Sequence, residues 1–209
     1  MPKKSKSKKS DLIVFTDGSC SSNGRNDAVG GIGIHFPNGE LEDLSKVFRL
    51  GCCTNQRAEL YAILIAIKFI KQEVGLRNYH VTIKTDSQYS IDCVTRWVYG
   101  WIKNGWMTKN DTPVANKEFI EDIHKYYEKY DITLEHVEAH TGADDEDSKS
   151  NAIADKLAVK ATKRAIVERS KDIKSNTVYK NQNQNRYQKS NNISNNISNN
   201  IVVELIKSK

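Results

Sequence analysis

The stretch Leu12-Ile13-Val14-Phe15-Thr16-Asp17-Gly18-Ser19 is an apolar, β-branched run that ends in an aspartate. Such a run predicts a buried strand. A second stretch, Val81-Thr82-Ile83-Lys84-Thr85-Asp86-Ser87, repeats the pattern. Aspartate at the end of a strand is most often a turn former or a helix cap, so either one alone indicates little. The repetition favours a shared site for Asp17 and Asp86.

Two further carboxylates accompany apolar segments. Glu59 lies in Thr54-Asn55-Gln56-Arg57-Ala58-Glu59-Leu60, and Asp155 ends Asn151-Ala152-Ile153-Ala154-Asp155. For Glu59, a solvated glutamate favoured by the helix dipole is the simple alternative. Four anions buried together are costly unless cations neutralise them. Hard divalent ions prefer oxygen ligands, and two of them can clamp the oxygens of a phosphoryl transfer, so we predict a metal-dependent phosphoryl-transfer site.

Length and composition predict one domain with tails. The chain has 209 residues, which is enough for a domain of about 150 residues. Five lysines crowd the first ten residues, and Asn, Gln, Ser and Lys dominate the sequence from about residue 177. Neither end can bury enough apolar surface to offset its ordering entropy. We therefore expect a basic disordered arm over residues 1–10, a catalytic domain over 11–170 and a disordered, Asn-rich tail over 171–209.

Charge and cysteine usage restrict the partners and the compartment. The formal net charge of +6 and the lysine-rich arm favour a polyanionic partner, although a solubility tail or a nuclear address would have the same composition. The longest apolar run, residues 60–67, is too short to cross a membrane, and no signal peptide is visible. The four cysteines lack zinc-ligand spacing, and adjacent Cys52 and Cys53 pair poorly in a disulfide. We expect a reducing intracellular compartment, either cytoplasm or nucleus.

Periodicity predicts an α/β fold with a mixed five-stranded sheet flanked by helices. Alternating segments at residues 29–36 and 42–50 extend the first strand into an antiparallel meander, and residues 80–85 and 132–137 supply two more strands. A helix capped by Thr54 or Asn55 should run to about Glu73. A second helix should open after Asp86, and a last one should cover residues 150–169. Asp17 and Asp86 then project from strand C-terminal ends, where open α/β sheets gather their ligands.

These motifs resemble the type 1 ribonuclease H family, in particular its cellular eukaryotic branch, over residues 11–165. The matching segments, in the family's order, are 16–20, 54–59, 85–89 and 97–106, followed by His140, Asn151 and Asp155. The resemblance implies a ribonuclease H-like fold. It also implies an endonuclease that hydrolyses the RNA strand of RNA–DNA hybrids, leaving 5′-phosphate and 3′-hydroxyl ends, with a role in RNA primer removal during DNA replication.

The resemblance also implies a catalytic centre. Asp17, Glu59, Asp86 and Asp155 would hold two Mg²⁺ ions, for which Mn²⁺ could substitute. One ion would activate the attacking water, and the other would stabilise the leaving 3′ oxygen. His140 would assist proton movement and product release, while an ordinary surface imidazole is the alternative for this residue.

Substrate contacts follow from the same family match. Contacts to the RNA 2′-hydroxyls in the minor groove are implied for Cys20, Ser22, Asn23, Asn55 and Gln56. Stacking against the DNA strand is implied for Tyr89, Trp97 and Trp101, and a DNA-phosphate pocket for Thr54 and Asn116. The tryptophans would otherwise be interpreted as core residues. The expected partner is an RNA–DNA hybrid duplex, with no membrane, no obligate protein partner and a monomeric state, and a viral protein acting in a host cell is compatible.

Departures from the family pattern are visible at several positions. Cys52, Ala139 and Ala152 stand where the family usually has arginine, glycine and an acidic residue. The segment between His140 and Asp155 is lengthened and carries four acidic residues at 144–147, which we expect in a loop. Two alternatives stay open: a nucleic-acid-binding module on a degenerate nuclease fold, and a related metal-dependent resolvase. Because all four carboxylates are present, the first alternative is disfavoured.

Overall fold

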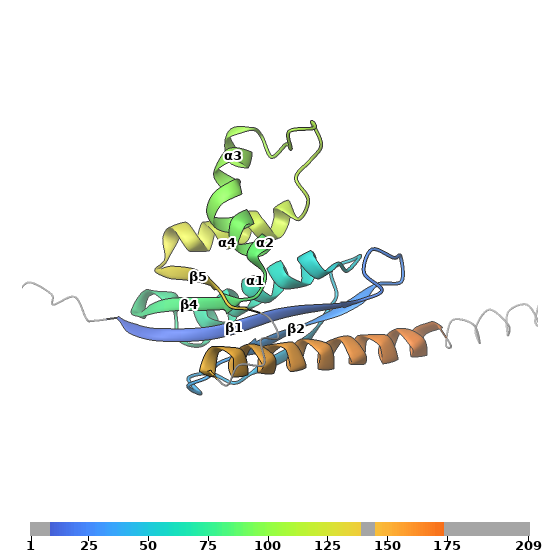
Figure 1. Ribbon diagram of the computed structural model, residues 1–209, viewed down its shortest axis with the longest axis horizontal. Coiled ribbons are helices and arrows are strands. Elements are labelled where there is room, and N and C mark those ends of the chain that lie inside the picture. The colour runs from blue at the N-terminus through green and yellow to red at the C-terminus, as the bar shows by residue number, and fades with distance from the viewer. Residues whose placement is uncertain (1–8, 139–144, 174–209) are drawn as a thin grey trace, which may run out of the picture. The chain divides into compact units, whose positions relative to one another are not determined.

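The computed structural model describes residues 9–138 and 145–173 and contains one five-stranded sheet (Figure 1). The strands are β1 (Ser10–Ser21), β2 (Val29–His35), β3 (Leu44–Phe48), β4 (Tyr79–Thr85) and β5 (Ile132–His136). Their order across the sheet is β3-β2-β1-β4-β5. β2 pairs antiparallel with β1 and β3, while β4 runs parallel to β1 and β5. The mixed five-stranded sheet predicted from the sequence is confirmed.

The helical elements are α1 (Asn55–Glu73), η1 (Leu76–Asn78), α2 (Gln88–Asp92), η2 (Cys93–Trp97), α3 (Val98–Lys103), α4 (Lys117–Lys129) and a last helix over residues 146–173. The last helix starts four residues before its predicted start. Asp145 explains the difference, because its carboxylate accepts hydrogen bonds from the Ser148 amide at 2.9 Å and the Ser148 hydroxyl at 2.8 Å. The acidic residues after 145 therefore belong to a capped helix rather than to a loop.

The third strand is shorter than the predicted 42–50. Its pairing with β2 extends only from Leu44 to Phe48. Just before it, the Asp43 carboxylate accepts a hydrogen bond from the Phe36 amide at 3.0 Å and contacts His35 Nδ1 at 2.8 Å. The Asp43 side chain thus stabilises a turn at the position where the alternating pattern predicted the start of the strand.

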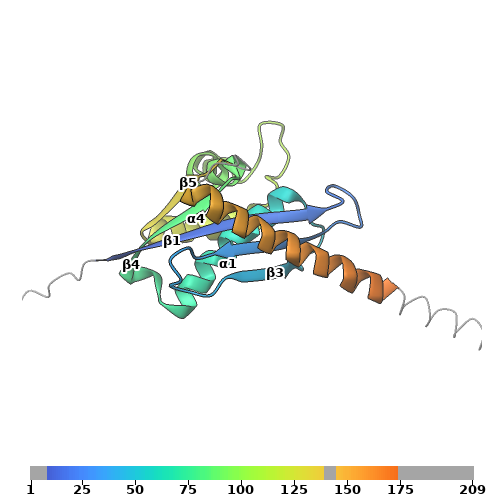
Figure 2. The same cartoon turned by 60° about the horizontal axis from the view of Figure 1, so that its bottom comes forward.

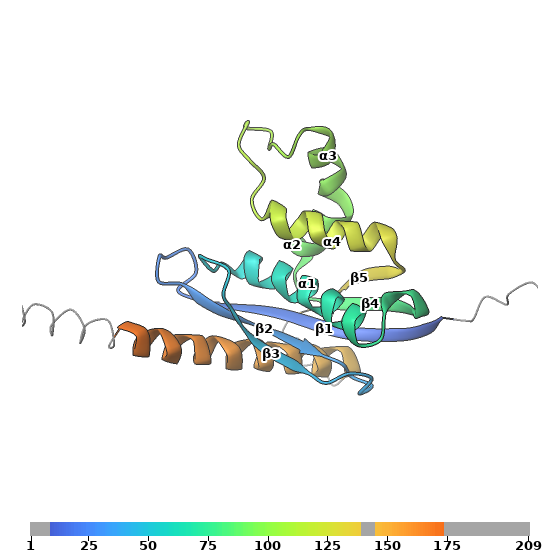
Figure 3. The same cartoon turned by 180° about the vertical axis from the view of Figure 1, so that it is seen from behind.

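Helix α1 covers one face of the sheet, on the same side as α2, α3 and α4 (Figures 1 and 3). The Thr54 hydroxyl caps its start by accepting from the Arg57 amide at 3.2 Å. The buried side chains of its apolar face are Leu60, Ile63, Leu64, Ile67 and Ile70. A Cβ atom at Gly18 of β1 would overlap the backbone of Ala58 and Glu59. Only glycine therefore permits this approach of α1 to β1.

The last helix covers the opposite face through its small residues (Figure 2). Cβ atoms at Gly31 and Gly33 of β2 would overlap Ala161 and the Ala154 carbonyl oxygen, respectively. Ala154, Ala158 and Ala161 are all fully buried. The helix consequently lies close enough to the sheet to bring Asp155, the residue after Ala154, toward Asp17 of β1.

The chain divides into two compact units, Met1–Ile166 and Val167–Lys209. Of the second unit, the structure describes residues 167–173, which are helical. The predicted division into arm, catalytic domain and tail stays a prediction, but β1 already begins at Ser10, inside the predicted arm. Among the described residues, every helix is too short or too polar to span a membrane.

Candidate active site

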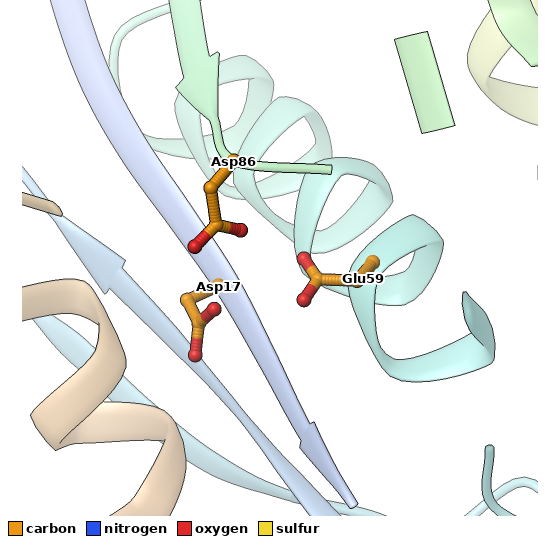
Figure 4. A group of neighbouring side chains, drawn as sticks. All are labelled: Asp17, Glu59 and Asp86. Carbon is orange, nitrogen blue, oxygen red and sulfur yellow. The ribbon is translucent and has the colours of Figure 1, made fainter. Parts of the chain in front are cut away.

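Three carboxylates from separate elements meet near the point where the parallel pairing of β1 and β4 ends, at the centre of the sheet (Figure 4). Asp17 lies within β1, which continues to Ser21, and not at a strand end as the sequence predicted. Asp17 comes from β1, Asp86 follows β4, and Glu59 lies in the second turn of α1. One oxygen from each lies within 4.8 Å of the others. The parallel register of β1 and β4 places Phe15 beside Lys84, so the aspartates two residues further along each strand are neighbours. Glu59 joins them because Gly18 allows α1 to approach β1.

Burial makes this carboxylate cluster (Asp17, Glu59 and Asp86) electrostatically unfavourable without a cation. Asp17 is only 7% exposed. Burial, followed by repulsion from Asp86 and Asp155, raises its pKa to about 7. Burial and the same kind of repulsion, chiefly from Asp17 and Asp86, hold the pKa of Glu59 well above its ordinary value. A divalent cation would reverse this repulsion.

The donor set fits a hard divalent cation. All three groups offer carboxylate oxygens, which are the ligands that Mg²⁺ and related ions prefer. Oxygen Oε2 of Glu59 is buried and has no hydrogen-bond partner among the described residues. A buried acceptor of this kind normally has a partner, and a metal ion would supply one.

The other two predicted catalytic residues, Asp155 and His140, are not part of this cluster. Asp155 is partly buried and lies outside the group of mutually close oxygens, although its charge contributes to the raised pKa of Asp17. Asn151, one turn earlier on the same helix, is 4% exposed and its amide donates to Asp86 Oδ2 at 3.4 Å. This contact ties the last helix to the cluster. His140 lies outside the described residues.

Two residues near the cluster were not singled out by sequence. His136 Nε2, at the end of β5, lies 3.2 Å from the main-chain oxygen of Asp86. Lys84 Nζ on β4 lies 2.5 Å from Asp147 and 3.7 Å from Glu135, and it sits over the Phe15 ring at 5.7 Å from its centroid. The ion pair with Asp147 fixes the start of the last helix to β4. Asp147 is therefore paired rather than free to repel a polyanion.

The residues expected at the RNA minor groove come from two neighbouring segments. Cys20 is half-buried near the end of β1, and Ser22 turns the chain with a left-handed φ of 59°. Asn23 Oδ1 accepts from the amide of Asn55 at 3.2 Å, which joins this turn to the start of α1. Gln56 is exposed on the first turn of α1. The structure thus joins the turn after β1 to the start of α1, the two segments that carry these residues.

Arg57 connects the two residues expected at the DNA phosphate, Thr54 and Asn116. Its role was not predicted from the sequence. Thr54 caps α1, and Arg57, one turn later, donates to Asn116 Oδ1 at 3.4 Å. The Asn116 amide in turn donates to the Tyr89 hydroxyl at 3.3 Å. Glu118 pairs with Arg57 at 2.8 Å, and the guanidinium lies 4.9 Å from the Phe119 ring centroid. Arg57 is therefore held by packing and charge while it orients Asn116.

The aromatic side chains of Tyr89, Trp97 and Trp101 form a row along α2, η2 and α3. The rings of Tyr89 and Trp97 lie 6.0 Å apart edge to face, and those of Trp97 and Trp101 lie 5.9 Å apart. Trp97 is 42% exposed, so the interpretation of these residues as core does not hold for it. A cavity of about 640 Å³ beside the row is lined by Trp97, Trp101, Arg96 and Lys109, among others. Exposed aromatic planes next to cationic side chains suit a nucleic-acid strand.

The chain is similar in sequence to known proteins. The family model described as RNase H matches residues 9–163. A probable ribonuclease H of Acanthamoeba polyphaga mimivirus is 54% identical over 143 residues, which cover 68% of this chain and 62% of the relative. Ribonuclease H1 of Mus musculus is 39% identical over 155 residues, which cover 74% of this chain and 51% of the relative. The chain thus spans between half and two thirds of the length of these relatives.

A solved structure shows a similar fold. It is the crystal structure of LC9-RNase H1, described as a type 1 RNase H with the type 2 active-site motif. Its sequence is 27% identical, its TM-score is 0.59, and the match covers 77% of this chain and 76% of that one. The likeness supports the RNase H-like α/β fold of this chain.

Proposed function

The chain belongs to the RNase H family, and from this premise we propose that it is an endonuclease that hydrolyses the RNA strand of RNA–DNA hybrids. The observation that carries the proposal is the cluster of Asp17, Glu59 and Asp86, whose oxygens lie within 4.8 Å of one another. The repulsion among these buried anions is unfavourable for folding, and a purely structural or binding role would not require them to lie together. The products would carry 5′-phosphate and 3′-hydroxyl ends.

The cofactor would be two Mg²⁺ ions, with Mn²⁺ as a substitute. Asp17, Glu59 and Asp86 would hold them, and Asp155 would complete the ligand set from the last helix. When bound, the ions would supply charge stabilisation to the attacking and leaving oxygens of the displacement. The contact of Asn151 with Asp86 Oδ2 supports the role of Asp86 as a metal ligand, because the hydrogen bond keeps this carboxylate oriented.

Proton movement and product release would fall to His140. His136 would support the site from β5 through its contact with the main chain after β4. His136 is the last residue of β5, the strand next to β4, and His140 comes four residues later in the sequence. His136 would fix the backbone of Asp86, and His140 would act on the reacting groups.

Recognition of the hybrid would be divided between two surfaces. Cys20, Ser22, Asn23, Asn55 and Gln56 would contact the RNA minor groove, where 2′-hydroxyls donate and accept hydrogen bonds. Tyr89, Trp97 and Trp101 would stack against the DNA strand, and Thr54 and Asn116 would hold a DNA phosphate. The orientation of Asn116 by Arg57 supports the phosphate contact, because it fixes a polar group beside the capped start of α1.

The proposal is tested by cleavage of a duplex with a labelled RNA strand. Full-length protein should cut the RNA of an RNA–DNA hybrid in the presence of Mg²⁺ and should not cut it after chelation. RNA–RNA and DNA–DNA duplexes of the same sequence should stay intact. Binding without cleavage would favour a degenerate binding module, and cleavage of a four-way DNA junction would favour a resolvase. Either result would overturn the proposal.

A further inference from the structure

The helical segment that carries the aromatic row contains a wide turn. In η2 the amide of Val98 bonds to the carbonyl of Cys93, five residues back, instead of four as in an α-helix. A regular helix advances about 100° per residue, so Tyr89 and Trp97, eight positions apart, would point about 80° apart. The wide turn takes up one residue, which makes their spacing equivalent to seven positions, about 20° apart. Their rings can then meet at 6.0 Å.

The same turn leaves a buried carbonyl that needs a donor. Because Val98 bonds to Cys93, the oxygen of Val94 loses the amide that a regular helix would supply. Val94 is fully buried, and an unsatisfied carbonyl at such a site is unfavourable. His124 of α4 supplies the donor, with Nδ1 at 3.0 Å from Val94 O. Since a carbonyl only accepts, Nδ1 must carry the hydrogen.

His124 is itself held on both sides. It is 7% exposed. The Tyr99 ring meets its ring edge to face at 5.1 Å, and the Tyr127 ring stacks on it at 6.4 Å. Tyr99 is further fixed by its hydroxyl, which donates to Glu128 of α4 at 2.7 Å. An imidazole in such a setting has one position, directed at the wide turn.

We propose that His124 is a positioning residue for substrate binding: it satisfies the carbonyl freed by the wide turn and thereby keeps Tyr89, Trp97 and Trp101 in one row. It does not touch the substrate. The inference rests on the proposed role of this row in binding the hybrid. It assigns to α4, which contributes none of the carboxylates, a direct influence on substrate affinity.

Three variants separate this role from simple core packing. His124→Leu keeps an apolar side chain at the site but removes the donor. His124→Asn keeps a donor at the place of Nδ1. Ile123→Val is the matched control, because Ile123 is a fully buried neighbour on α4 whose trimming weakens packing without touching Val94 O. The readouts are the tryptophan near-ultraviolet circular dichroism of the free protein, and KM and kcat for a hybrid duplex.

The leucine variant should raise KM about tenfold with kcat little changed, and it should alter the tryptophan signal, as expected for one unsatisfied buried carbonyl. The asparagine and Ile123→Val variants should stay within about twofold of wild type. An unchanged KM and signal for leucine, or an equal rise for Ile123→Val, would overturn the inference. If the leucine protein does not fold, His124→Gln replaces it, because its amide lies one carbon farther out and misses Val94 O. The His124→Asn variant should then bind the hybrid more tightly than the His124→Gln variant, and equal affinities would overturn the inference.

The failure of this inference can be told apart from failure of the proposed function. A wild-type protein that does not cut the hybrid would contradict the nuclease assignment alone. The tryptophan signal of the free variants needs no substrate, so it would still report whether His124 holds the row. A changed signal in the leucine variant but not in asparagine or Ile123→Val supports the positioning role, and no difference among the three contradicts it.

Discussion

The carboxylate cluster and the aromatic row differ in what holds their side chains in place. Asp17 lies in β1 and Asp86 follows β4, the neighbouring parallel strand at the centre of the sheet, and Glu59 is brought against them by the close approach of α1 at Gly18. The row of Tyr89, Trp97 and Trp101 instead lies on one irregular helical segment outside the sheet. Central strands provide a rigid frame, whereas the helical segment depends on α4 for its shape.

The difference suggests a division of labour. A catalytic centre needs its groups held within a fraction of an ångström, and central strands supply that precision. A surface that stacks on a long, variable polymer tolerates more movement, and a short helical segment suffices for it. Changes at the cluster should therefore abolish the reaction, while changes at the row should weaken binding.

The largest effect is expected from Asp17→Asn. This change removes a negative charge from the centre of the proposed metal site, and we expect cleavage to fall roughly a thousandfold. Affinity for the hybrid should change little, because the proposed function assigns binding to the row and to phosphate contacts. Cleavage rate and dissociation constant of one preparation provide the check. A residual rate above about a tenth of wild type would remove Asp17 from the assigned role.

Gly18→Ala should give the next largest effect. Its new methyl group would overlap the Ala58 and Glu59 backbone, so α1 must move away from β1. We expect a loss of about 1–3 kcal/mol in unfolding free energy from this overpacking. Displacement of Glu59 should lower kcat by about a hundredfold. Gly100→Ala is the control, since a Cβ there meets nothing within 4 Å. It should preserve kcat and should not lower stability, because alanine favours the helical backbone of α3.

The raised pKa values predict a pH-dependent stability of the metal-free protein. The folded pKa of Asp17 is about 7, against an ordinary value of 3.8, so the folded state prefers the protonated form. Its stability contribution is complete below about pH 4 and is lost as pH rises through 7, at about 1.4 kcal/mol per pKa unit. The contribution of Asp17 should therefore lower the Tm of the metal-free protein between pH 4 and pH 7, and other titrating groups add their own contributions.

Mg²⁺ should raise Tm more at pH 8 than at pH 5, since only the ionised cluster binds it well. Asp17→Asn should be more stable than wild type at pH 8 without metal, and it should respond less to Mg²⁺. Thermal unfolding of both proteins with and without Mg²⁺ is the measurement. A wild-type Tm that ignores Mg²⁺ at both pH values would count against a metal site.

Removal of residues 1–8 should have the smallest effect. It deletes four lysines but retains Lys9, which pairs with Asp131 at 2.8 Å beside the start of β1. Each lost phosphate contact should flatten the plot of log affinity against log salt by about 0.9. Hybrid binding at several salt concentrations tests this, with kcat and Tm expected to stay at wild-type values. An unchanged slope would mean that the arm does not contact the substrate.

Local patterns were sufficient to predict most of the fold. The alternation of apolar residues located the strands. The helix predicted to be capped by Thr54 or Asn55 and to run to about Glu73 matches α1, which has Thr54 as its N-cap. The early start of the last helix also had a local signal, because Asp145 stands three residues before Ser148, a spacing typical of helix caps. The loop expected there followed from the family pattern, in which the segment between His140 and Asp155 is shorter. Here the capping signal was the better guide.

Contacts between distant residues could not be predicted in this way. Tyr89, Val94 and Trp97 fit a regular amphipathic helix, and no local feature indicates the wide turn between them. Its hydrogen-bond partner His124 lies 30 residues beyond Val94. The partnership of Arg57 with Asn116 spans 59 residues. The sequence thus indicated the three carboxylates that the structure brings together, whereas the contacts of His124 and Arg57 required coordinates.

The division of labour is tested most directly by single-turnover cleavage of a hybrid at increasing protein concentration. Trp97→Ala should need roughly tenfold more protein than wild type but should reach a similar plateau rate, because only stacking is lost. Asp17→Asn should saturate at the wild-type concentration with a plateau near zero. A Trp97→Ala plateau far below wild type, or an Asp17→Asn rate that recovers at high protein concentration, would contradict the assignment of chemistry to the cluster and binding to the row.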